Sequence, residues 1–307
     1  MNEELFSVNE WEFSISYDAD DNQLSEHRMD AVLLADAIKN VAQAIKRADE
    51  ILNGKNRNIR TYVTAPAKEG SLEVEFIAQL INPELATNIL QALGFMTVAG
   101  AVVGGVFKAL REISGKEIIA VHTSDEHPEF AKLELSDGTT MELPKDEALL
   151  TASPAIRSHI KQIVAAPLYH RDEPVFKILN GADELELKFN DTDIKAIKEV
   201  KIKSLPPRID KITVMASFSQ VNFEGNTGWK IQLDGNTIVT AELLDDAFLN
   251  QVAANQQSFK KEDMYKMVLE VTTYTNDLGK ESKKYKILQV LYNSHQELNN
   301  VSRNGIF

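Results

Sequence analysis

The residues best suited to metal or acid–base chemistry are four histidines in the middle of the chain, with carboxylates close to them in sequence. No two of them have the short spacing of a helical metal motif such as His-Glu-x-x-His. We interpret them as separate surface histidines, and the sequence predicts no cofactor, no metal site and no catalytic residue. The set consists of His122, Asp125, Glu126, His127, His159, His170 and Asp172.

One motif in this set has the letters of a known catalytic loop. His170-Arg171-Asp172 matches the loop of protein kinases, but the glycine-rich loop, the paired lysine and the Asp-Phe-Gly signature are missing. The chain also has no cysteine, which excludes thiolate nucleophiles, disulfides and cysteine-bound metals. The sequence therefore favours a non-enzymatic protein. An enzyme with a site built from dispersed Asp, Glu and His residues stays as an alternative.

A second set of residues has the chemistry of ligand contact, because aromatic rings can stack on bases and lysines can meet phosphates. It lies in the C-terminal third of the chain, where positive and negative charges nearly balance. Most aromatic side chains of a small domain belong to its core, so contact with nucleic acid or a small ligand is the less favoured interpretation. The candidate contact residues are Trp229, Lys230, Tyr274, Lys283 and Lys284.

The elements that would position this second set follow a simple order. Pro206-Pro207 marks a boundary, and residues 205–307 then contain three expected strands, at 209–218, 229–233 and 237–241. A helix capped by Asp245 and Asp246 comes next, followed by strands at 264–273 and 285–291. Three strands, a helix and two strands is the order of a five-stranded OB-like barrel, and this is the fold we expect here.

The central stretch from residue 85 to residue 107 has no charged side chain. A helix start at Asn82-Pro83 precedes it, and Gly94 could divide it into a helical hairpin instead of one continuous helix. It is long enough to cross a bilayer core of roughly 30 Å. Three alternatives stay open, which are a buried core helix or hairpin, an oligomer interface, and a membrane segment. The residues expected to act there are Gly94, Phe95, Gly100, Val103, Gly104, Val106 and Phe107.

Charge patterning bears on the membrane alternative. Lys108, Arg111 and Lys116 follow the stretch, so a membrane span would keep that end in the cytoplasm and would require the N-terminal unit to cross. The first residues do not have the form of a secretory signal peptide. We therefore expect a cytoplasmic protein, with peripheral or inserted association at the inner membrane as the alternative.

The remaining segments predict two α+β units. Residues 1–81 contain a strand at 11–17, a helix that Asp30 caps and Gly54 ends, and two strands at 59–65 and 71–77, which is a β-α-β-β unit. Residues 82–115 form the apolar helix or hairpin. Residues 116–204 form a mixed middle unit with a hairpin at Asp137-Gly138, a helix that Ser153-Pro154 opens, and strands at 175–179 and 184–189.

Composition sets the class of the protein. The chain has 307 residues and a 43% hydrophobic fraction, which suits two or three small folded domains. Its net charge of -13 gives no long-range attraction for nucleic acid or anionic lipid. We therefore expect self-association or a partner protein, with a membrane as a further possibility and nucleic acid disfavoured by the charge.

The assembled pattern resembles a loose set of uncharacterised bacterial and prophage-borne accessory proteins. The resemblance rests on Gly70-Ser-Leu-Glu-Val-Glu-Phe76, the apolar segment with its basic end, the Asp137-Gly138 hairpin, Ile163-Val-Ala-Ala-Pro-Leu168 and a small terminal barrel. It brings no catalytic residues. It implies a place in mobile genetic regions, where phage-defence systems collect.

These observations give two leading hypotheses. The first is a non-enzymatic, phage-defence-related protein whose central apolar segment mediates oligomerisation or membrane engagement, with recognition by the flanking domains. The alternative is an OB-type binding module for single-stranded nucleic acid or a small ligand.

Overall fold

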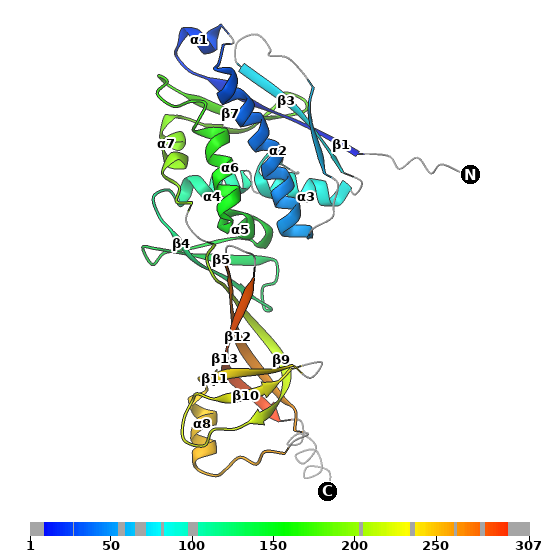
Figure 1. Cartoon of the computed structure of the whole chain (residues 1–307), viewed down its shortest axis with the longest axis vertical. Helices are drawn as coiled ribbons and strands as arrows, with labels where there is room; N and C mark the ends of the chain where they lie inside the picture. Colours follow the sequence, from blue (N-terminus) through cyan, green and yellow to red (C-terminus); the bar gives the residue numbers. More distant parts are fainter. Residues whose placement is uncertain are drawn as a thin grey trace, which may run out of the picture. The chain divides into compact units, whose positions relative to one another are not determined.

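The structure is a computed structural model of the whole chain (Figure 1). It describes residues 9–26, 28–54, 59–64, 72–80, 83–97, 104–202, 205–233, 237–260, 263–276 and 280–293. The chain forms two compact units. The first consists of Met1–Ile118 with Leu135–Leu205, and the second of Ile119–Glu134 with Pro206–Phe307. The fold is mixed α+β, as the sequence predicts.

The first unit is built on a five-stranded sheet in which segments far apart in the chain pair with each other. Its order is β2-β3-β1-β7-β8, so the N-terminal strands are joined to strands of the predicted middle unit. The central strand β1 is antiparallel to both neighbours, and Ile15 lies opposite Val74 on one side and Ile178 on the other. The strands are β1 (Asn9–Asp18), β2 (Arg60–Val63), β3 (Leu72–Leu80), β7 (Val175–Asn180) and β8 (Leu185–Phe189).

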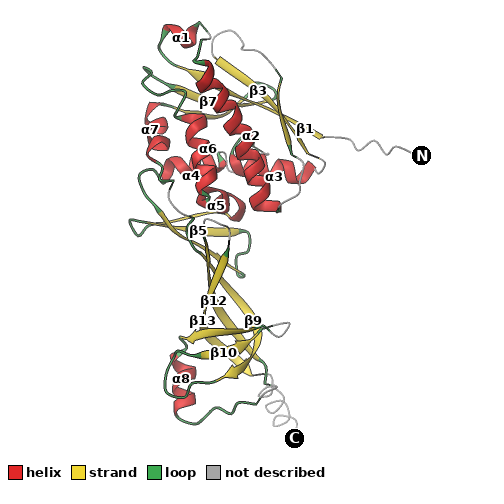
Figure 2. Ribbon diagram, viewed as in Figure 1, coloured by secondary structure: helices red, strands yellow, loops and turns green. Residues whose placement is uncertain are grey.

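Helices of the first unit cover one face of this sheet (Figure 2). The longest, α2 (Ala31–Asn53), begins where the Asp30 side chain accepts hydrogen bonds from the Val32 and Leu33 amides, and it ends at Gly54. Both predicted helix boundaries are confirmed. The other helices are α1 (Asn22–Ser25), α3 (Pro83–Leu93), α4 (Gly105–Glu112), α5 (Lys145–Ala152), α6 (Pro154–Val164) and α7 (Asp191–Glu199).

The core of the first unit lies between the sheet and these helices. Alternation along β1 sends Phe13, Ile15 and Tyr17 into the core, where each is at most 2% exposed. The Phe13 ring begins a chain of aromatic contacts, since its centroid lies 4.7 Å from that of Phe95, and the Phe95 centroid lies 5.2 Å from that of Phe107. The described ends of the apolar stretch are thus tied directly to the central strand.

The apolar stretch does not form one continuous helix through its described part. Helix α3 ends at Leu93, and α4 begins at Gly105. Gly94 and Gly104 both have left-handed backbones, with φ of 97° and 115°, and a Cβ on Gly94 would lie 2.3 Å from the Gly104 carbonyl oxygen. Only glycine permits this approach. The arrangement corresponds to the hairpin alternative.

The side chains expected to form a membrane or oligomer surface lie in the core instead. Phe95, Val106 and Phe107 are fully buried, and the two phenylalanine rings pack against rings of the sheet. Gly100 and Val103 fall outside the described residues. Among the described residues, no helix is both long and apolar enough to cross a membrane.

The second unit contains a closed barrel of five strands. Strand β9 pairs with β10 on one side and with β12 on the other, and the ring continues through β11 and β13. Strands β11 and β13 are parallel, while β10–β11, β12–β13 and β9–β12 are antiparallel. The barrel elements are β9 (Arg208–Gln220), β10 (Trp229–Gln232), β11 (Ile238–Leu243), α8 (Asp246–Ala253), β12 (Tyr265–Thr275) and β13 (Glu281–Asn293).

The sheet of the second unit continues past β9 with two further strands that are not part of the barrel. Strand β4 (Ile118–Ser124) is parallel to β9 and is followed in the sheet order by β5 (Phe130–Leu135). Strand β6 (Thr140–Pro144) follows the predicted turn at Asp137-Gly138, where the Leu135 amide donates to the Thr139 carbonyl at 2.9 Å.

The division into units differs from the four segments expected from the sequence. Segments 1–81, 82–115 and most of 116–204 share one core, because β1 pairs with β7 and the apolar helices pack on the same sheet. Residues 119–134 join the C-terminal segment, because β4 pairs with β9. The boundary expected near residue 205 coincides with the start of the second unit's long segment.

Candidate functional site

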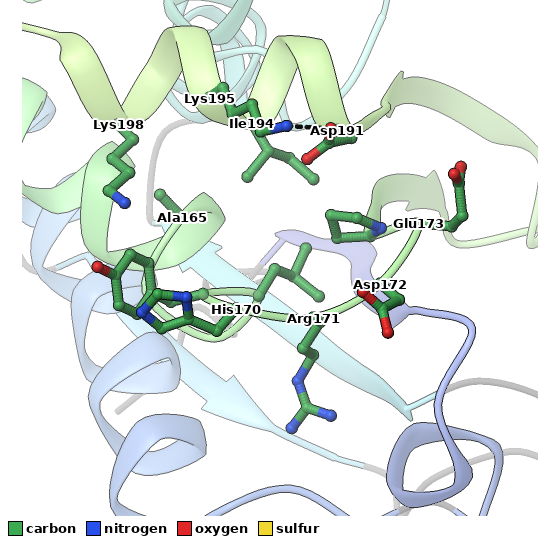
Figure 3. Close-up of a pocket in the computed structure, with 12 residues that line it drawn as sticks. Ala165, His170, Arg171, Asp172, Glu173, Asp191, Ile194, Lys195 and Lys198 are labelled. Atoms are coloured by element: carbon green, nitrogen blue, oxygen red, sulfur yellow. Dashed lines mark hydrogen bonds and ion pairs between the residues drawn. The ribbon is translucent and has the colours of Figure 1, made fainter.

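A cavity in the first unit lies between helix α7 and the loop that joins α6 to β7 (Figure 3). The end of α6 is fixed to the sheet, because the buried Tyr17 hydroxyl donates a 2.8 Å hydrogen bond to the Ile163 carbonyl. Burial raises the pKa of Tyr17 far above its usual value, so this phenol stays protonated and donates. The loop at residues 165–174 therefore starts from a rigid point.

Two residues of this loop have strained backbones. His170 and Glu173 have φ of 61° and 48°, a region that side chains other than glycine seldom adopt. Each such residue costs on the order of 1–3 kcal/mol and persists only where its surroundings hold it. Between them, the Asp172 carbonyl accepts a 2.8 Å hydrogen bond from the Asp20 amide. Strain of this kind is common at ligand sites, and it draws attention to this loop.

Arg171 holds the loop in place from below. Its Nη1 lies 2.6 Å from Asp21 Oδ2, its Nε donates to the Pro167 carbonyl, and its side chain is 12% exposed. Burial alone would raise the pKa of Asp21, but hydrogen bonds from the Leu24 amide and Arg171 lower it further than burial raises it. In Figure 3 the guanidinium points away from the cavity. Arg171 thus holds the loop against the segment that contains Asp21.

Helix α7 forms the opposite wall of the cavity. Asn190 and Asp193 form a reciprocal capping box at its start. The helix presents Lys195, which is paired with Asp191 one turn earlier, and Lys198. The Lys198 Nζ lies 3.8 Å from the centroid of the Tyr169 ring, within the range of a cation–π contact.

The cavity has a volume of about 350 Å³ and combines an apolar floor with a polar rim. Ala165, Leu168, Pro174 and Ile194 are buried and form the floor. The His170 ring lies against the Tyr169 ring, with centroids 3.7 Å apart. Such a combination is typical of small-molecule sites. The rim consists of Tyr169, His170, Asp172, Glu173, Asp191, Lys195 and Lys198.

A second polar cluster lies on the sheet of the first unit. One carboxylate oxygen from each of Glu73, Glu75 and Asp183 lies within 4.8 Å of the others, and Ser14 Oγ donates to Glu73 at 2.7 Å. Oxygen ligands of this type suit a hard cation. This group could not be recognised in the sequence, because Asp183 lies more than a hundred residues after Glu73 and Glu75 and meets them only through the strand pairing.

The histidines singled out from the sequence do not come together. His122 Nε2 lies 2.9 Å from Glu134 in the second unit, and His159 Nδ1 lies 2.7 Å from Asn40 in the first. Burial lowers the pKa of His159, and Arg47 and Lys39 lower it further. His127 lies in the turn after β4, and His170 lines the cavity. None belongs to the one metal-compatible group found among the described residues.

The candidate contact residues of the second unit are divided between core and surface. Trp229 is fully buried and donates from Nε1 to the Gly225 carbonyl at 2.9 Å, so the expectation of a ligand contact is corrected to a core role. Its ring packs against Phe218, with centroids 5.3 Å apart. Lys230, Lys283 and Lys284 are exposed. Tyr274 is 42% exposed, and Lys284 Nζ lies 5.3 Å from its ring centroid.

Comparison of the chain with protein-family models, with curated proteins and with solved structures gives no match.

Proposed function

We propose that the protein is a non-enzymatic binding protein and that its second unit is an OB-type barrel that captures single-stranded nucleic acid. The observation that carries this proposal is the strand order. The ring β9-β10-β11-β13-β12 closes on β9, β11 runs parallel to β13, and α8 lies between the third and fourth strands. This is the order of the OB fold, whose members bind oligonucleotides and oligosaccharides.

The β12–β13 hairpin supplies suitable chemistry for such a ligand. Residues 280–286 contain four lysines and one glutamate, although the chain as a whole is acidic. Lys286 is tied to Glu270 at 2.8 Å, while Lys283 and Lys284 are exposed beside the accessible ring of Tyr274. Lysines next to an aromatic ring can neutralise phosphates while a base stacks on the ring.

Strands β10 and β11 form another part of the barrel wall. Its outward side chains include Lys230 and Ile238, and Phe223 in the preceding loop is 60% exposed. In OB folds, this face and its flanking loops carry the ligand. A strand of nucleic acid lying across β10 and β11 would therefore meet one lysine and one exposed aromatic ring.

The test is fluorescence anisotropy of a labelled 20-nucleotide oligo-dT and of an oligo-U of the same length, titrated with the full chain. Replacing Lys283 and Lys284 together by alanine should weaken binding and reduce the dependence of log affinity on log salt by about one to two. The matched control replaces Lys188 and Lys195, in the first unit, by alanine. If wild type binds neither oligonucleotide at low salt, or if both double variants bind alike, the proposal fails.

The other expectations from the sequence are not needed for this proposal. A role in phage defence and self-association stay predictions from the sequence. Membrane engagement has less support, because Phe95, Val106 and Phe107 would have to leave the core of the first unit to reach a bilayer.

A further inference from the structure

The cavity between α7 and the loop at residues 165–174 has two sides of opposite charge (Figure 3). Lys198 and His170 lie on one side, next to the Tyr169 ring. Asp172 and Glu173 lie on the other side, and Asp191 lies on the helix across from them, where it pairs with Lys195. Of the buried side chains, Ala165 lies beside Lys198, and Ile194 lies on the helix between Lys198 and Asp191. The described residues that line the cavity all belong to the first unit.

This charge distribution selects against ligands with one sign of charge. A phosphate or a dicarboxylate that reached Lys198 would bring its remaining charge toward Asp172 and Glu173, neither of which forms an ion pair with a described residue. A polyamine would meet Lys198 and Lys195 in the same way. Unpaired or repelled charges in a partly enclosed site reduce affinity, and this repulsion gives selectivity.

We propose that this cavity binds a small zwitterion whose carboxylate and ammonium groups are separated by an apolar stretch, such as a short peptide with free termini or an ω-amino acid. The carboxylate would meet Lys198 beside His170, and the ammonium would meet Asp172 and Glu173. The apolar stretch would lie on Leu168, Pro174 and Ile194. At about 350 Å³, the cavity is at the small end of the roughly 300–1,000 Å³ of ligand sites, which suits a dipeptide-sized molecule.

The backbone geometry indicates that the cavity is built rather than accidental. The backbone is strained at His170 and at Glu173, one residue on each charged side, so the fold maintains an unfavourable conformation that presents both groups.

The experiment is isothermal titration calorimetry of the full chain at low ionic strength with two zwitterionic probes, the dipeptide Leu-Leu and 6-aminohexanoate. The two probes distinguish a peptide from an ω-amino acid as the source of the shared chemistry. The matched controls are acetyl-Leu-Leu, which lacks the ammonium group, and Leu-Leu amide, which lacks the carboxylate. At least one zwitterion should bind, and the blocked dipeptides should bind about tenfold more weakly or not at all, because each loses a charge-assisted contact.

Protein variants assign the two ends of the ligand. Lys198→Met should weaken zwitterion binding about tenfold and leave the affinity for Leu-Leu amide unchanged, because the amide has no carboxylate to lose. Asp172→Asn should weaken zwitterion binding about tenfold and leave the affinity for acetyl-Leu-Leu unchanged, because that probe has no ammonium group to lose. Lys201→Met and Glu199→Gln are the controls, since both residues are exposed in the same unit and do not line the cavity. Circular dichroism and thermal melting without ligand check that all four variants are folded.

The proposal is overturned if neither zwitterion binds wild type, if a blocked dipeptide binds as tightly as Leu-Leu, or if Lys201→Met has the same effect as Lys198→Met. Tyr274→Ala, in the second unit, should not alter zwitterion binding. The zwitterion titration and the oligonucleotide titration can therefore fail separately.

Discussion

The two units build their cores in different ways. The first covers one face of an open sheet with helices and depends on close backbone approach, since Gly94 contacts Gly104 where α3 and α4 meet. The second closes its strands into a ring and fills one region with aromatic side chains around Phe218, whose ring lies 4.9 Å from that of Tyr265. An open layered core is thus sensitive to local backbone geometry, whereas a closed barrel is sensitive to the volume inside it.

The largest effects should come from removing one central aromatic side chain in each unit. Phe107→Ala and Trp229→Ala should each lower the free energy of unfolding of their own unit by about 3–5 kcal/mol, through lost burial and the cavity left behind. Differential scanning calorimetry should show one displaced transition for each variant. If either variant displaces both transitions equally, the two units do not unfold independently.

A glycine substitution sharpens the comparison within the first unit. Gly94→Ala should destabilise it by about 3 kcal/mol, because the new Cβ would collide with the Gly104 carbonyl and alanine disfavours the local φ. Gly138→Ala is the matched control, since its φ of 81° is similar but nothing lies within 4 Å of the new Cβ. Urea denaturation should show a loss of about 1–2 kcal/mol in the free energy of unfolding for the control. Equal losses for both variants would refute the role of close approach.

The hydrogen bond from Tyr17 to α6 should have a moderate effect. Tyr17→Phe removes the donor and leaves the Ile163 carbonyl buried without it, so we expect a loss of about 1–3 kcal/mol in the first unit. Urea denaturation measures the loss. Tyr169→Phe, at a half-exposed ring, serves as the control and should change stability by less than about 0.5 kcal/mol. A loss as large in the control would count against a specific role for the buried phenol.

The smallest expected effect is pH-dependent and belongs to the first unit alone. Burial raises the pKa of Glu147 to about 7, with Glu112 raising it and Lys108 lowering it. Because the folded-state pKa is raised above the unfolded value, this residue's contribution is complete below the unfolded pKa and is lost as the pH rises through about 7. After allowance for solvent screening, the free energy of unfolding should fall by about 1–2 kcal/mol between acidic and neutral pH.

Glu147→Gln should remove that pH dependence from the first unit. The stability of the second unit should respond to pH in the same way in wild type and variant. Urea denaturation of wild type and variant at pH 5 and pH 8 measures the difference. An unchanged pH profile in the variant would assign the effect to other groups.

Local features of the fold could be predicted from the sequence, because the residues that determine them are adjacent in the chain. Asp30, Ser153 and Asp245 cap helices as expected, and the Asp137-Gly138 turn forms where it was predicted. Pairing between distant segments could not be predicted, since nothing in residues 9–18 specifies that β1 will meet β7. For that reason, the segments expected from the sequence differ from the two compact units.

The same limit applies to the sites. His170-Arg171-Asp172 stood out in the sequence, but the loop gains its meaning only from the strain at His170 and from Lys198 on a different element. Glu73 and Glu75 look like ordinary outward residues of a strand until the strand pairing brings Asp183 to them. Trp229 looked suitable for stacking because residue type alone does not distinguish a buried ring from an exposed one.

The pairing of β1 with β7 also has a consequence for synthesis on the ribosome. Strand β1 ends at Asp18 and its partner begins at Val175, so at about 5–20 residues per second the first strand waits roughly 10–30 s for this neighbour. During that time, the free edge of β1, which pairs with β3 on its other side, has no permanent partner and can pair with other chains. We therefore expect the N-terminal strands to bind chaperones during translation. Slower elongation after residue 80 would prolong the exposure of the β1 edge.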